Sequence, residues 1–241
     1  MNIIVVKTEQ EIGQKTGDLI LNKVKENPKA VIGLATGSSP LSTYKYIIEN
    51  SKKENVSWHD ITTFNLDEYK GLSGIHNQSY RYFMTHNLFN HIDIQKENTF
   101  VPSGMIESDD EVKVYDEKIK NAGGIDIQLL GIGVNGHIGF NEPGTSFDSL
   151  TSVVDLTDQT IEANSRFFND KSEVPTQAVS MGLKSIMNAK EIVLIAMGEN
   201  KAKAIKELVT GEVSTDWPCT ILQNHPKVTL IIDEKAASLL D

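Results

Sequence analysis

Short apolar runs alternate along the chain with longer segments in which apolar residues recur every three or four positions. The short runs have the length of buried strands, and the longer segments have the periodicity of helices that bury one side. Strands are expected at residues 3–6, 30–35, 61–65, 125–130, 192–197 and 228–232. This alternation predicts an α/β fold with a largely parallel sheet.

The first helical segment has clear end signals. Thr8 and Glu11 have the spacing of a capping box, and Asn27 and Pro28 end the helix that follows. Its buried side is expected to comprise Ile12, Thr16, Leu19, Ile20 and Val24. A second helix is expected after a glycine turn at residue 37, and a short helix after the last strand.

The alternating pattern continues along the chain without a break that would separate two domains. The sequence contains no internal repeat, low-complexity tract or linker that would separate domains, so we expect residues 1–241 to form a single domain. The stretch at about 155–175 is polar, and we expect it to form a mobile lid over a cleft.

Composition narrows the classes of partner. The 241 residues include 33 acidic and 23 basic side chains, which gives a net charge of −10. This charge repels phosphate backbones and anionic lipids, so we expect neither nucleic acid nor a membrane as a partner. An anionic substrate would need a site with its own positive potential.

Cysteine content and apolar run lengths predict the compartment. Cys219 is the single cysteine, which excludes an internal disulfide and is typical of a reducing compartment. The apolar run at the start of the chain ends at Lys7, too early for a signal peptide, and no run has membrane-spanning length. We therefore expect a cytoplasmic protein.

Candidate chemistry follows four of the expected strands, where ligands of parallel sheets gather. After the second strand, Thr36, Gly37, Ser38 and Ser39 precede Pro40. Gly37 permits a tight turn, Ser39 is expected to cap the next helix, and exposed N–H groups at a helix start favour a phosphate. An ordinary strand-to-helix turn explains the same residues equally well.

Two adjacent carboxylates follow the third strand, at Asp67 and Glu68. Placed together at the ligand-binding edge of a sheet, they repel one another and lose hydration unless something uses them. One of them, with a raised pKa, is a candidate general base. The alternative is a solvated loop acid.

The segment 131–144 after the fourth strand is rich in glycine and carries His137, Glu142 and Asn135. Its glycines match the G-x-G-x-x-G pattern, but a dinucleotide site needs a helix at the third glycine, and the following glycines and Pro143 would break one. We expect instead a tight loop that presents His137 beside a carboxylate and an amide, a set suited to proton transfer. The alternative is a structural histidine.

After the fifth strand, Lys201 stands in the first turn of a helix, where a cation opposes the helix dipole unless an anion is bound. It is a candidate phosphate ligand, or a lysine that is solvated or paired with Glu199. The histidines lack the spacing of metal ligands, so no metal is expected, and no G-x-S-x-G elbow supports a serine nucleophile.

Taken together, these segments closely resemble the glucosamine-6-phosphate deaminase family. The matching pieces are 33–40, 64–69, 136–143, 163–168 and Lys201, and the similarity extends from the first strand to residues 225–227. The resemblance implies a Rossmann-like, mostly parallel sheet with helices on both faces and no organic cofactor. It also implies conversion of glucosamine 6-phosphate to fructose 6-phosphate and ammonia, in the catabolism of amino sugars such as N-acetylglucosamine and sialic acid.

The resemblance also implies residue roles. Residues 36–39, Arg166 and Lys201 would bind the sugar phosphate. His137 would open the pyranose ring, with Glu142 and Asn135 holding the imidazole. Asp67 would carry a proton from C2 to C1 of the open chain.

Two departures from the family pattern change these expectations. Many members have aspartate where this chain has Asn135, so the partner of His137 is neutral here. Allosteric hexameric members have a longer C-terminal region and two basic residues at the positions of Ser152 and Val154. We therefore expect a monomer or small homo-oligomer without activation by N-acetylglucosamine 6-phosphate.

Two other functions remain as alternatives. A 6-phosphogluconolactonase shares the implied fold but needs neither Asp67 nor Glu142. A sugar-phosphate sensing module would be joined to a DNA-binding helix-turn-helix, for which this acidic chain has neither room nor charge.

Overall fold

Seven parallel strands form the main sheet of the computed structural model, which describes residues 1–108, 110–165, 168, 170 and 173–240. Their order across the sheet is β1-β10-β9-β6-β2-β3-β5. The strands are β1 (Asn2–Val6), β2 (Val31–Leu34), β3 (Thr62–Asn65), β5 (Thr99–Phe100), β6 (Ile127–Leu130), β9 (Ile192–Ala196) and β10 (Val228–Asp233). All six predicted strands are present, and the parallel α/β fold is confirmed.

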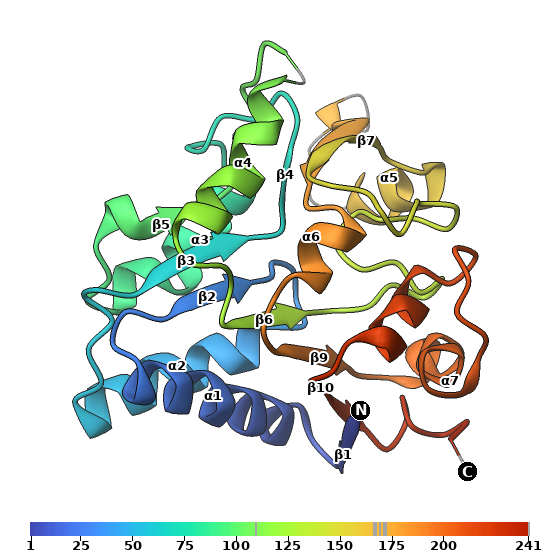
Figure 1. Ribbon diagram of the computed structural model, residues 1–241, viewed down its shortest axis with the longest axis horizontal. Coiled ribbons are helices and arrows are strands. Elements are labelled where there is room, and N and C mark those ends of the chain that lie inside the picture. Colours follow the sequence, from blue (N-terminus) through green and yellow to red (C-terminus); the bar gives the residue numbers. More distant parts are fainter. Residues whose placement is uncertain (109, 166–167, 169, 171–172, 241) are drawn as a thin grey trace.

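Helices cover both faces of this sheet (Figure 1). In that view α1 and α2 lie below it, while α4 and α6 lie above it. The α-helices are α1 (Glu9–Glu26), α2 (Leu41–Glu54), α3 (Tyr80–Asn87), α4 (Asp110–Asn121), α5 (Asp158–Ser165), α6 (Leu183–Met187) and α7 (Ala202–Thr210). Short 3₁₀ turns are η1 (Phe89–His91), η2 (Lys96–Asn98), η4 (Glu199–Lys201) and η5 (Pro218–Asn224). Within the described residues, no helix is both long and apolar enough to cross a membrane.

A second, antiparallel sheet was not predicted from the sequence. It has the order β4-β8-β7 and is built from β4 (Asp67–Tyr69), β8 (Gln177–Ser180) and β7 (Ser152–Asp155). These strands are three or four residues long and join segments far apart in the chain. Local periodicity therefore had too few positions to reveal them.

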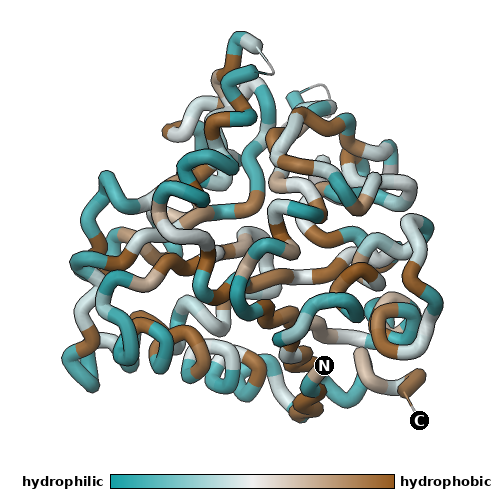
Figure 2. Tube along the Cα trace, in the orientation of Figure 1, coloured by the Kyte–Doolittle hydropathy of each residue, from teal (hydrophilic) through white to brown (hydrophobic). Residues whose placement is uncertain are grey.

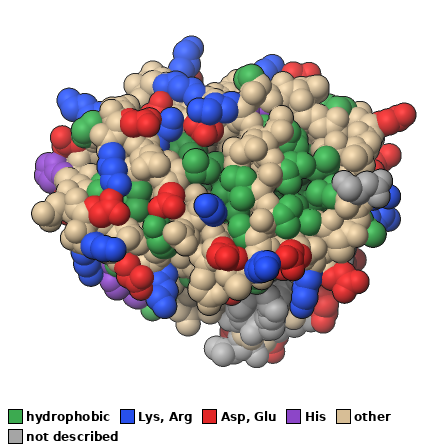
Figure 3. Space-filling view, turned by 90° about the horizontal axis from the view of Figure 1, so that it is seen from below, with side chains coloured by type: hydrophobic (Ala, Val, Ile, Leu, Met, Phe, Trp, Pro, Cys, Tyr) green, Lys and Arg blue, Asp and Glu red, His purple; other side chains and the backbone are tan. Residues whose placement is uncertain are grey.

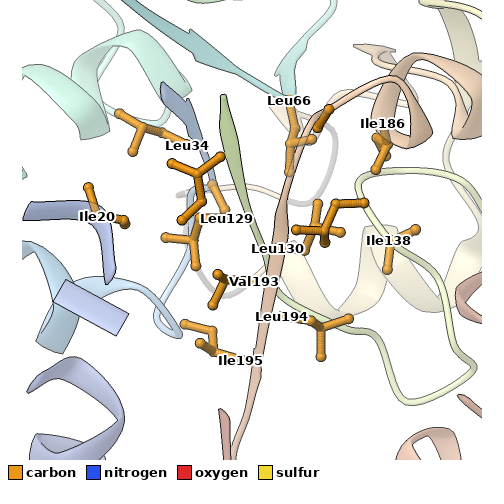
Figure 4. Close-up of a cluster of buried hydrophobic side chains, with 14 of the residues drawn as sticks. Ile20, Leu34, Leu66, Leu129, Leu130, Ile138, Ile186, Val193, Leu194 and Ile195 are labelled. Atoms are coloured by element: carbon orange, nitrogen blue, oxygen red, sulfur yellow. The ribbon is translucent and has the colours of Figure 1, made fainter. Parts of the chain in front are cut away.

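The core lies between the main sheet and its helices. Strands β6, β9 and β10 are buried at every position, which explains their continuous apolar runs in the sequence. Leu34, Leu129 and Val193 come from three neighbouring strands and pack in one cluster (Figure 4). Burying each such side chain contributes about 1.5–3 kcal/mol.

The distribution of polarity follows this arrangement. The hydropathy colouring of Figure 2 places apolar residues mainly in the central strands and on the inward sides of the helices. On the face shown in Figure 3, acidic and basic side chains are interspersed around an area of hydrophobic ones.

Helix ends confirm one prediction and correct two. Thr8 and Glu11 form the predicted capping box at α1. Ser39 does not cap α2: Pro40 is the N-cap, and the N–H of Leu41 donates to the Ser38 carbonyl instead. The predicted terminal helix is also wrong, because residues 234–239 form successive turns. So few residues do not offset the cost of helix nucleation.

The chain order creates a switch point in the main sheet. From β2 the chain continues to β3 and β5 on one side, then crosses to β6, β9 and β10 on the other. The segments that leave β2 and β6 therefore diverge to opposite sides. A crevice at the carboxyl ends of such a pair is where open α/β sheets bind ligands.

Candidate active site

A cavity of about 330 Å³ lies at this edge of the sheet. Its walls come from the segments that follow β2, β3, β6 and β9, which are neighbours in the sheet. Six of the predicted site residues line it: Thr36, Ser39, Asp67, Asn135, His137 and Lys201. The four strand ends that carried unusual residues in the sequence thus meet in one place.

The loop after β2 forms one wall. Gly37 has a φ of +94°, a conformation that favours glycine, and allows the chain to turn sharply toward α2. The hydroxyl of Tyr44 donates to the carbonyl of Ala35 and ties the start of the loop to α2. Thr36 and Ser39 face the cavity, and Ser38 lines an adjoining cavity with Ser39. Ser39 is thus available to a ligand because it does not cap the helix.

Lys201 lies at the end of η4, in the segment after β9, and its side chain reaches the loop after β6. Its Nζ donates to the carbonyl of Ile132 at 2.7 Å, and burial lowers its pKa. Gly198, with a φ of +94°, turns the chain so that Lys201 directly precedes α7. Lys201 and Ser39 both line the cavity, and they also share the adjoining cavity. Lys201 thus brings a positive charge to the cavity wall of a chain that is acidic overall.

Asp67 begins β4, directly beyond the end of β3, and is only 6% exposed. Burial, and secondarily the charge of Glu68, raises its pKa to about 8. Gly139 approaches closely: a Cβ there would lie 3.7 Å from Asp67 Oδ2 and 3.2 Å from Ser180 Oγ. A carboxyl in this setting takes up and releases a proton near neutral pH.

Glu68 is buried but faces away from the cavity. Its carboxylate accepts backbone N–H groups of Tyr69 at 2.9 Å, Tyr80 at 2.9 Å and Arg81 at 3.0 Å. Tyr80 and Arg81 form the first turn of α3, so this contact joins β4 to the helix start. Strand alternation separates the two carboxylates, with Asp67 on the cavity side. The sequence identified both carboxylates as candidates for the general base but did not show which of them faces the cavity.

The glycine-rich loop after β6 presents His137. The N–H of Gly133 donates to the His137 carbonyl at 2.9 Å, which closes the loop. The imidazole lies so close over Gly133 that a Cβ there would be 2.3 Å from ring atoms. Gly136 has a φ of +81° and packs against Trp217 and Cys219. No helix begins at Gly136, in agreement with the rejection of a dinucleotide site.

Glu142 stands behind the imidazole. Its Oε1 lies 3.5 Å from His137 Nδ1, longer than a good hydrogen bond, and Nδ1 has no closer partner among the described residues. Asn135 Nδ2 donates to Oε2 at 2.7 Å, and Thr160 Oγ1 donates to Oε1 at 2.9 Å. Burial alone would raise the pKa of Glu142, but His137, Asn135 and Thr160 outweigh it and lower it to about 2.

Asn135 contacts both members of this pair. Besides donating to Glu142, it accepts the backbone N–H of His137 through Oδ1 at 3.3 Å. The amide of Asn135 can make both contacts because its NH₂ group donates and its oxygen accepts. A carboxylate at this position would have only acceptors and could not donate to Glu142. The neutral residue at this position thus fits an ionised Glu142.

Two residues that line the cavity were not identified from the sequence: Tyr80 and Thr160. Tyr80 and Thr160 lie on helices with no glycine or turn signal to mark them. Arg166, predicted as a phosphate ligand, lies outside the described residues. In the described part of the chain, no three His, Cys, Asp or Glu side chains are grouped as metal ligands.

The chain is similar to known proteins in its family pattern, its sequence and its structure. The family model of glucosamine-6-phosphate isomerases/6-phosphogluconolactonase matches residues 7–231. A glucosamine-6-phosphate deaminase of Mycoplasma mycoides subsp. mycoides SC is 54% identical over 240 residues, covering 100% of this chain and 98% of its own. That of Thermoanaerobacter pseudethanolicus is 53% identical over 241 residues, covering 100% of this chain and 95% of its own.

Solved structures agree with this grouping. A monomeric glucosamine-6-phosphate deaminase superposes with a TM-score of 0.97 at 44% identity, covering 99% of this chain and 100% of its own. The 6-phosphogluconolactonase of Trypanosoma brucei shares the fold with a TM-score of 0.79 but only 16% identity, covering 100% of this chain and 98% of its own. The chain therefore belongs to the glucosamine-6-phosphate isomerase/6-phosphogluconolactonase family.

Proposed function

We propose that this protein is a glucosamine-6-phosphate deaminase, which converts glucosamine 6-phosphate and water to fructose 6-phosphate and ammonia. The observation that carries the proposal is the pairing of Asp67 and His137 in one cavity. An isomerisation needs a base at carbon, and ring opening needs an acid/base at oxygen. Full-length relatives at 49–54% identity have this activity in their names.

The phosphate of the substrate would bind at the end of the cavity formed by residues 36–39 and Lys201. Thr36 and Ser39 offer hydroxyl groups, and Lys201 offers a half-buried positive charge. The family resemblance implies that Arg166 is a further phosphate ligand, and we include it in the proposal on that ground. Anchoring the phosphate at one end positions the reacting carbons at the other.

His137 would open the ring by moving a proton between the C1 hydroxyl and the ring oxygen. Glu142 carries a negative charge over the whole physiological range because its pKa is about 2. The carboxylate lies 3.5 Å from Nδ1 and would fix the orientation of the imidazole ring. Asn135 and Thr160 keep the carboxylate in place.

Asp67 would then take the proton from C2 of the open-chain aldose and return it to C1. Meanwhile the C1 oxygen gains a proton and the nitrogen on C2 loses one, so that C1=O becomes C1–OH, C2–NH₂ becomes C2=NH, and a 2-imino sugar results. Water adds to this imine and ammonia leaves, so that fructose 6-phosphate remains. A carboxyl with a pKa of about 8 suits both directions of transfer, since it neither holds nor loses its proton strongly at neutral pH.

Assembly, lid and location belong to the same proposal. We infer a single-domain enzyme that acts as a monomer or small homo-oligomer in the cytoplasm, in amino-sugar catabolism. A monomeric deaminase at 44% identity supports the assembly. Residues 155–175 include α5, whose Thr160 lines the cavity, and this supports their role as a lid.

The test is to supply purified protein with glucosamine 6-phosphate and to follow ammonium and fructose 6-phosphate. Equimolar appearance of both is the expected result. Hydrolysis of 6-phosphogluconolactone, without release of ammonium from the amino sugar, would overturn the proposal.

A further inference from the structure

The carboxylate of Glu142 is held by two parts of the chain that are otherwise separate. Asn135 donates to Oε2 from the loop after β6, and Thr160 donates to Oε1 from α5. Oε1 is also the oxygen that faces His137 Nδ1 at 3.5 Å. The hydroxyl of Thr160 and the imidazole therefore share one oxygen atom.

The direction of the Thr160 hydroxyl is set by its neighbour. Thr157 Oγ1 donates to Thr160 Oγ1 at 3.0 Å and accepts the backbone N–H of Thr160 at 3.2 Å. A hydroxyl has one proton to give, and Thr160 receives a proton from Thr157. Its own proton is consequently directed to Glu142, so the first turn of α5 acts as a fixed donor.

We propose that Thr160 is a positioning residue that holds the carboxylate of Glu142 in place beside His137 for ring opening. With the Thr160 hydroxyl present, Oε1 of Glu142 is held facing His137 Nδ1. Without that hydroxyl, Oε1 loses its donor, and the carboxylate is free to turn toward Asn135 and away from the imidazole. This inference rests on the proposed function, because it assigns Thr160 to the ring-opening half of that reaction.

The position of Thr160 places its contact with Glu142 beside the substrate cavity. Thr160 lines the substrate cavity, and α5 lies on the same side of the molecule as the small sheet, apart from α1 and α2 (Figure 1). Thr160 thus supports the imidazole, through Glu142, from the wall of the cavity that would hold the substrate.

Two substitutions distinguish the contribution of the Thr160 hydroxyl to activity from that of the side-chain shape. Thr160→Val keeps the size and branching but removes the donor, whereas Thr160→Ser keeps the donor. We expect Thr160→Val to lower kcat about 10- to 100-fold, the range for a hydrogen bond to a charged group, with KM changed less than about twofold. Thr160→Ser should retain kcat within about threefold of the wild-type value.

Two further measurements exclude a general disturbance of the pocket. The open-chain amino alcohol 2-amino-2-deoxyglucitol 6-phosphate needs no ring opening, so its Kd should be the same for Thr160→Val and the wild type. In a Glu142→Gln background, Thr160→Val should change kcat less than about twofold, because the two residues act through one contact.

Several outcomes would overturn the inference while leaving the proposed function intact. These are wild-type kcat in Thr160→Val, equal losses in the valine and serine variants, weaker binding of the amino alcohol, or additive effects in the double variant. Failure of the wild-type protein to release ammonium from glucosamine 6-phosphate would instead remove the proposed function itself.

Discussion

Replacing Asp67 with asparagine should stabilise the protein increasingly as the pH rises toward 8. In the unfolded chain this carboxyl ionises near its ordinary pKa of 3.8, but in the folded protein burial holds its pKa at about 8. Between these values the folded state binds a proton that the unfolded state has released. Stability of the wild type is therefore lost as the pH rises through this window and levels off above it. Asparagine does not titrate, so the variant does not lose stability through this group as the pH rises.

The size of the effect follows from the difference between the two pKa values. Each pH unit within the window changes the free energy of unfolding by about 1.4 kcal/mol. From pKa 3.8 to pH 7 the upper limit is about 4 kcal/mol. Charge relaxation around the ionised form reduces this limit, but even half of it, about 2 kcal/mol, is a large part of the stability of an ordinary domain.

Urea unfolding of wild type and Asp67→Asn at pH 5, 6, 7 and 8 measures this dependence directly. Asp93→Asn is a matched control with the opposite sign. Asp93 accepts from Ser57 Oγ and the Trp58 N–H at 2.6 Å each, and these contacts hold its pKa below the ordinary value. Its replacement should lower stability equally at all four pH values. An Asp67→Asn difference that stays constant within about 0.5 kcal/mol would refute the reasoning.

Four further predictions concern activity. The kcat/KM should rise with pH up to about 8, because only ionised Asp67 accepts the C2 proton; a flat profile from pH 6 to 8 would contradict this. Lys201→Met should raise KM about tenfold or more with little change in kcat, measured by initial rates, since it removes uniform phosphate binding. Gly133→Ala should abolish activity, because its Cβ would lie 2.3 Å from the His137 ring; wild-type turnover would exclude this packing. N-acetylglucosamine 6-phosphate should leave the rate curve hyperbolic and unshifted, and a sigmoidal-to-hyperbolic change on titration would count against the absence of allostery.

Most of the main sheet was predictable because its central strands are buried on both faces, whereas the two-residue strand β5 at its edge was not predicted. Runs such as β9 and β10 are apolar at nearly every position, which separates them from the helices around them. The capping box at α1 was equally local. The small sheet escaped prediction because β4 pairs with β8 across more than a hundred residues, and neither strand carries an apolar run.

The same difference between local signals and long-range contacts separates the features of the site that were predicted from those that were not. Asp67 and His137 were predicted because strand ends and glycines mark them within the sequence. Thr160 and Glu68 depend on partners brought near by folding: Thr160 on Glu142, and Glu68 on the N–H groups of α3. Adjacent carboxylates in a short strand point to opposite faces, a rule that would have separated Glu68 from Asp67 had β4 been recognised.

The central claim is that Asp67 alone carries a proton from C2 to C1. Turnover of glucosamine 6-phosphate in D₂O, with nuclear magnetic resonance of the product, tests this directly. A single base that acts from one side, and exchanges part of its protons with D₂O between the two transfers, should place deuterium at only one of the two hydrogen positions on C1 of fructose 6-phosphate, and Asp67→Asn should incorporate none. Deuterium spread evenly over both positions, or unchanged labelling in Asp67→Asn, would contradict it.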